Sequence, residues 1–106
     1  MRDRIRVSEP APNSAVRSPL TVRGQARGTW YFEASFPVKL LDANGRILAQ
    51  APAQAQGEWM TENFVPFSVT LTFQVPPPGP GTLVLEKDNP TGLPEHAAEL
   101  RIPLQF

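Results

Sequence analysis

The sequence has no cysteine, a single histidine and no long apolar run. Without cysteine there are no disulfides, so 106 residues must build a hydrophobic core unaided. No stretch approaches the roughly 20 apolar residues of a membrane-spanning helix, so this segment is not expected to insert into a membrane. Ten basic residues balance ten acidic ones, and this lack of excess positive charge argues against nucleic acid as a partner.

Thirteen prolines weigh against helices, and the clearest signal that remains is that of a strand. Residues 67–75 alternate apolar and polar side chains without interruption. Because successive side chains on a strand point to opposite faces, this pattern predicts a half-buried antiparallel strand. Its expected core face consists of Phe67, Val69, Leu71, Phe73 and Val75.

Six further short strands are expected, separated by turns rich in glycine, proline and asparagine. They fall at 4–7, 20–25, 34–41, 46–50, 82–87 and 100–106, and the mostly apolar strand at 82–87 is expected to be central. About seven short strands and no convincing helix predict an all-β fold, an antiparallel immunoglobulin-like β-sandwich. Residues 1–106 are expected to form this single domain.

Two registers are open for the hairpin that follows the third expected strand. A two-residue turn ending at Gly45 places Ile47 on the core side, whereas a type I turn followed by Gly45 in the left-handed region places Leu48 there. We favour the second register, because Asp42 then accepts hydrogen bonds within the turn and Gly45 takes the positive φ. Leu41 and Ile47 would share the outer face, where they form a candidate contact patch.

Four stretches resemble the immunoglobulin-like domain associated with bacterial spore-germination proteins, a family that also occurs in envelope lipoproteins. They lie at 18–22, at 28–38, at 57–60 together with 64–67, and at 83–94, and the most specific is the run Phe-Glu-Ala-Ser-Phe-Pro-Val at 32–38. The resemblance implies an exported accessory module attached to other domains, without enzymatic activity or a known ligand site. It therefore implies an extracytoplasmic location, with the leader outside this sequence and the domain excised from a larger exported protein.

The candidate binding residues are the aromatic side chains at strand ends, Trp30, Tyr31 and Trp59, together with Glu33. Aromatic residues in such places anchor protein partners or stack on sugar rings. The alternative is that each tryptophan closes an end of the sandwich, because tryptophan is largely buried on average.

Catalytic and metal sites find little support. His96 lies in an expected loop without a nucleophile or an orienting acid at a suggestive spacing. The oxygen ligands around 86–95 lack the dense spacing of a calcium loop; they are Glu86, Asp88, Asn89 and Glu95. Acids for glycoside hydrolysis exist only as the scattered Glu33, Glu58 and Glu62. No enzyme activity, metal or cofactor is therefore predicted.

The function predicted from the sequence is that of a non-enzymatic, extracytoplasmic protein-interaction or spacer module of the bacterial envelope, whose partner is another protein or a fused envelope domain. One alternative is a carbohydrate- or peptidoglycan-binding module that uses Trp30, Tyr31, Glu33 and Trp59. Another is a protease inhibitor, which requires the loops at 27–31, 56–64 and 88–95 to gather at one end.

Overall fold

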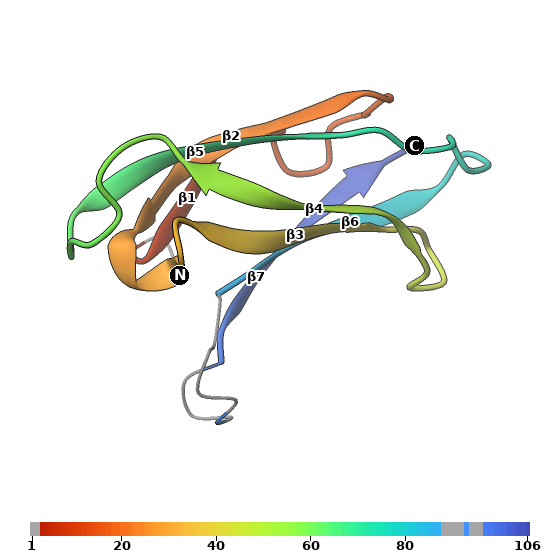
Figure 1. Cartoon of the computed structure of the whole chain (residues 1–106). Coiled ribbons are helices and arrows are strands. Elements are labelled where there is room, and N and C mark those ends of the chain that lie inside the picture. The colour runs from red at the N-terminus through yellow and green to blue at the C-terminus, as the bar shows by residue number, and fades with distance from the viewer. Residues whose placement is uncertain (1–2, 88–92, 94–96) are drawn as a thin grey trace.

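The computed structural model describes residues 3–87, 93 and 97–106, and its architecture is all-β (Figure 1). Seven strands form one antiparallel, nearly closed sheet in the order β1-β2-β5-β4-β3-β6-β7. They are β1 Ile5–Glu9, β2 Leu20–Arg27, β3 Ser35–Leu41, β4 Ile47–Ala55, β5 Phe64–Leu71, β6 Pro80–Glu86 and β7 Glu99–Gln105. This arrangement confirms the predicted fold class. The strand expected to be central, β6, is an inner strand between β3 and β7 but lies next to the end of the sheet order.

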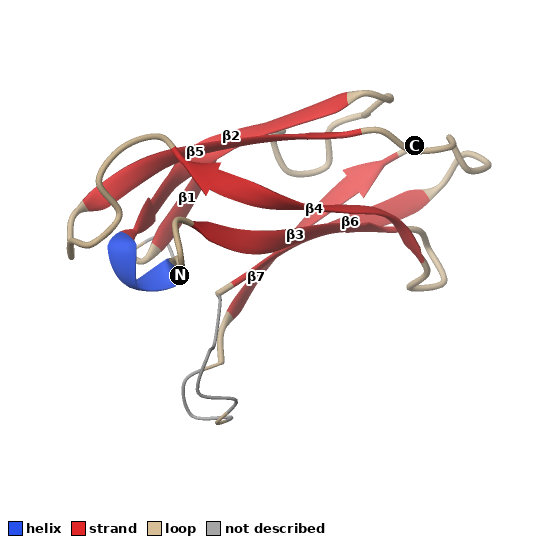
Figure 2. Cartoon of the chain, viewed as in Figure 1, coloured by secondary structure: helices blue, strands red, loops and turns tan. Residues whose placement is uncertain are grey.

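Among the described residues, helical structure is confined to one 3-10 turn, η1 Gly28–Trp30, which follows β2 (Figure 2). In the part of the chain that the structure describes, no helix has the length and apolar character needed to cross a bilayer.

The sheet folds into two layers, and β4 passes from one layer to the other. It pairs with β3 along its whole length but with β5 only at Gln54 and Ala55. From Ala49 to Ala55, the residues of β4 that pack against the core are alanines, and Ala53 is fully buried opposite Phe36. Because alanine side chains occupy little space, the strand can lie close to both layers at this corner.

The inner faces of the two layers meet through a column of aromatic rings. The Phe36 ring on β3 contacts Phe67 on β5 and Tyr31 edge to face, with ring centroids 5.0 and 5.2 Å apart respectively. Phe67 lies opposite Gly24 on β2, where a Cβ atom would overlap the Arg6 carbonyl oxygen and stand 2.9 Å from the Phe67 ring. Glycine at position 24 therefore leaves the space that this ring and β1 occupy.

The strand predicted at 67–75 is real, but its boundaries are different. β5 starts three residues earlier, at Phe64, and ends at Leu71, which pairs with Leu20, the first residue of β2. Phe73 is buried as predicted, whereas the prediction for Val75 is wrong, because that side chain is 59% exposed. Because β2 begins at Leu20, it has no residue that could pair with the positions after Leu71. The strand β5 therefore ends there, although the apolar alternation of the sequence continues to Val75.

The β3–β4 hairpin has the favoured register. Gly45 has a φ of 80°, and its N–H donates to the Asp42 carbonyl oxygen at 3.0 Å. The Asp42 side chain accepts from the N–H groups of Asn44 and Arg46 at 2.8 and 2.9 Å. Leu48 packs against the core and Ile47 is exposed opposite Leu41, as expected.

A short extended segment, residues 13–16, pairs with the last strand at one end of the sheet order. It runs parallel to the end of β7: the N–H of Asn13 donates to the Pro103 carbonyl oxygen and that of Val16 to the Gln105 carbonyl oxygen. The Gln105 N–H in turn donates to the Ser14 carbonyl oxygen at 2.9 Å. The main-chain groups of residue 103 point away from β6, toward residues 13–16. Because Pro103 has no N–H to donate there, the hydrogen-bond ladder to residues 13–16 ends at this residue.

We expect Phe67→Ala to lower the free energy of unfolding by about 3–5 kcal/mol, because it empties the centre of the aromatic column. Thr70→Ala, on the exposed face of the same strand, should change stability by no more than about 0.5 kcal/mol. Urea unfolding of both variants measures the difference, and equal losses would contradict the assigned faces of β5.

Candidate functional site

The aromatic residues singled out in the sequence lie at one end of the sandwich, and two of them belong to the core. The η1 turn directs Trp30 and Tyr31 inward, where they are 1% and 4% exposed. The Tyr31 hydroxyl donates to the Val65 carbonyl oxygen at 2.7 Å, and burial raises the pKa of this phenol far above its ordinary value of 10.0. Neither ring has an exposed face on which a sugar could stack. Trp30 is instead buried at an end of the sandwich, as the alternative interpretation expects.

The other two predicted binding residues remain accessible to different degrees. Trp59 is half-buried and packs against the core, whereas Glu33 is exposed in a left-handed conformation with a φ of 51°. Since Trp30 and Tyr31 are covered, the predicted four-residue surface is not assembled as a set of exposed rings.

Two of the three loops required for an inhibitor-like end do meet. The Gly28 N–H donates to the Asn63 carbonyl oxygen at 3.2 Å, and Arg27 Nη1 donates to the Glu62 carbonyl oxygen at 3.1 Å. These bonds join the loop at 27–31 to the loop at 56–64. Of the third loop, 88–95, only Leu93 belongs to the described residues, so the clustering of all three stays a prediction.

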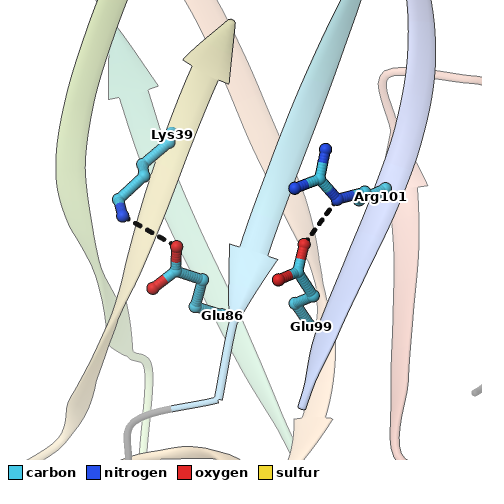
Figure 3. A network of polar contacts seen from close by, with 4 residues as sticks. All are labelled: Lys39, Glu86, Glu99 and Arg101. Carbon is cyan, nitrogen blue, oxygen red and sulfur yellow. Dashed lines mark hydrogen bonds and ion pairs between the residues drawn. The ribbon is translucent and has the colours of Figure 1, made fainter. Parts of the chain in front are cut away.

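The remaining candidate ligands do not converge within the described part of the chain. His96, Asp88, Asn89 and Glu95 lie outside the described residues. Glu86 of β6 pairs with Lys39 of β3 at 2.8 Å (Figure 3). Among residues 3–87, 93 and 97–106, no three metal-ligating side chains gather.

A different feature was not found in the sequence: an open seam between the two end strands of the sheet. We use this term for the groove of about 380 Å³ between β1 and the first half of β7. Its walls are largely apolar, formed by Ile5, Val7, Pro10, Pro12, Leu100 and Ile102. Residues 13–16 pair with the second half of β7, and beside its first half no strand among the described residues pairs with the outer edge of β7.

The main chain on both sides of the seam points its hydrogen-bonding groups into it. The Arg27 N–H donates to the Arg4 carbonyl oxygen, so the alternating antiparallel ladder turns the N–H and C=O groups of Ile5 and Val7 away from β2. On β7, the Lys87 N–H donates to the Ala98 carbonyl oxygen. By the same alternation, the main-chain N–H and C=O groups of Arg101 point away from β6. The Arg101 side chain bonds Glu99 on its own strand (Figure 3).

Arginine side chains cover the outer face beside the seam. Arg6 and Arg27 lie over the Phe64 ring, 4.0 and 4.3 Å from its centroid, and Arg4 lies 5.4 Å from that of Trp30. Stacking on rings holds the guanidinium groups in place. The face formed by β1 and β2 therefore carries ordered arginines, and a further one, Arg23 of β2, pairs with Glu9 of β1 at 3.4 Å.

The fold defines an immunoglobulin-like domain, with first and last strands at opposite ends of the sheet order and a short segment that pairs in parallel with the last strand. The family model for the immunoglobulin-like domain of bacterial spore germination matches residues 4–92, and the chain belongs to this family. It is not a known enzyme family, which supports a non-catalytic domain. Comparisons with curated proteins and with solved structures give no match.

Because Tyr31 is the only tyrosine, its ionisation can be followed by absorbance. The folded protein should show little tyrosinate at pH 10, where a free phenol is half ionised. Since burial raises the folded pKa, the stability that depends on the neutral phenol is fully present below about pH 10. It is lost as the pH rises further, and Tyr31→Phe should remove this loss. A half-ionised Tyr31 in the folded protein at pH 10 would contradict its burial.

Truncation of the two tryptophans should separate core from surface. Trp30→Ala should cost about 3–5 kcal/mol of unfolding free energy, and Trp59→Ala roughly half as much because its ring is only half-buried. Thermal melts of the two variants provide the measurement. A neutral Trp30→Ala that instead lost binding to cell-wall sacculi would restore the carbohydrate-binding alternative.

Proposed function

We propose that this domain is a non-catalytic protein-interaction or spacer module of a larger exported protein of the bacterial envelope, with another protein or a fused envelope domain as its partner. The observation that carries the proposal is the family match over residues 4–92. The absence of a membrane-crossing helix among the described residues is compatible with an extracytoplasmic location.

The surface of the domain supports contact with a protein more than contact with a glycan. A protein partner can use the main-chain groups and apolar walls of the open seam, together with the charged face beside it. A glycan would need exposed aromatic faces, and burial of Trp30 and Tyr31 leaves only half-buried Trp59 from the predicted set. We therefore retain protein interaction as the function.

The experiment compares the full-length parent protein with a version lacking residues 4–106, both produced from the native locus with the same tag. Deletion should lower recovery of co-purified partners or alter localisation in the envelope while leaving the amount of parent protein unchanged. A parent carrying Thr70→Ala, a change on the exposed face of β5, serves as the matched control. Unchanged localisation and unchanged partner recovery on deletion would refute the proposal.

A further inference from the structure

The first 27 residues of the chain carry an excess of positive charge that the overall balance conceals. They contain six arginines against Asp3 and Glu9, a net charge of +4. The remainder contains four basic and eight acidic residues, a net charge of −4. The charge is thus segregated along the chain, and the fold places three of these arginines on two adjacent strands, Arg6 on β1 and Arg23 and Arg27 on β2.

The arginines on and before β1 alternate with the apolar residues that line the open seam. Arg4 and Arg6 lie on the outer face, whereas Ile5 is buried and Val7 is half-buried. The free edge of β1 therefore presents a repeating pattern: a positive charge on one face, an apolar side chain on the other, and outward main-chain groups at Ile5 and Val7.

An added strand would meet this pattern residue by residue. In an antiparallel pair, residues directly opposite share a face, with Cβ atoms about 5 Å apart. Positions opposite Arg4 and Arg6 would favour acidic side chains, and positions opposite Ile5 and Val7 would direct apolar side chains into the seam, against Leu100 and Ile102. The chain itself shows that an extended segment can pair at the facing edge of the sheet, since residues 13–16 bond to the end of β7.

We propose that the free edge of β1 binds an extended segment of a partner protein in which acidic and apolar residues alternate. The inference rests on the proposed function and names the surface and the chemistry of the partner. Main-chain bonds to Ile5 and Val7 provide the pairing, the seam selects the apolar residues, and the arginines select the acidic ones. A membrane surface fits less well, because none of the large exposed hydrophobic residues belongs to β1 or β2: Phe32, Ile47, Met60, Val75 and Leu93.

The probe is a capped, fluorescein-labelled hexapeptide of alternating glutamate and valine, titrated with the whole domain and followed by anisotropy. Three competitors are compared with it: the lysine–valine counterpart, a peptide of the same composition with three glutamates followed by three valines, and inorganic polyphosphate. The alternating peptide should bind about tenfold more tightly than either control peptide and lose affinity as salt is added. Equal affinity for the block peptide, or stronger binding of polyphosphate, would overturn strand pairing.

Two sets of variants test the edge and the charges separately. Val7→Pro removes an N–H that points away from β2, so no bond within the sheet is lost, just as Pro103 is accommodated on β7. This variant should bind the peptide about tenfold more weakly and largely retain its melting temperature. Arg4→Gln combined with Arg6→Gln should also weaken it about tenfold. Arg17→Gln combined with Arg46→Gln makes the same change in net charge at exposed positions away from β1 and should change affinity less than about twofold.

These results are independent of the deletion experiment on the parent protein. If all variants bind the peptide like the wild-type domain, or if both arginine pairs have the same effect, the edge is not the binding site. If deletion of the domain removes partner recovery while Val7→Pro in the parent does not, the interaction function stands and the assignment to β1 falls. If Val7→Pro unfolds the domain, the arginine pairs alone decide.

Discussion

The edge-to-face contact between Phe36 and Phe67 connects the two layers of the sandwich, and the rest of the structure depends on it. Its ring spacing sets the distance between β3 and β5, and Tyr31 extends the column and ties it to β5 through the Val65 carbonyl oxygen. The contact exists because position 24 has no side chain, so Phe67 can lie against β2. A hydrophobic column of this kind stabilises through buried area and through the favourable geometry of perpendicular rings.

Local patterns in the sequence were sufficient for the fold class and for the hairpin. Apolar alternation identified the core face of β5 and the buried Phe73 that follows it, and the pairing of Asp42 with Gly45 identified the turn. Strand ends were not predictable in this way, because β5 stops where β2 runs out of partners, a property of the pair rather than of either strand. The burial of Trp30 depends on a single 3-10 turn that a period-two or helical pattern does not reveal.

The open seam and the arginine face required knowledge of strand order. The arginines on and before β1 and those of β2 are separated by more than a dozen residues in the sequence, and only antiparallel pairing brings Arg4 beside Arg27. An overall net charge of zero hides this segregation, although the six arginines among the first 27 residues were visible in the sequence. The position of free main-chain groups follows from the phase of the ladder, which is set by three-dimensional pairing alone.

The bridge between residues 13–16 and the end of β7 constrains the order of events during synthesis. It joins parts of the chain about ninety positions apart, and such distant contacts form late because their loop closure is entropically unfavourable. A nascent chain that emerges amino-terminus first holds β1 and residues 13–16 unpaired with β7 until position 105 has cleared the ribosome or the translocation channel. During that interval, other extended chains can compete with β7 for pairing with the early strands.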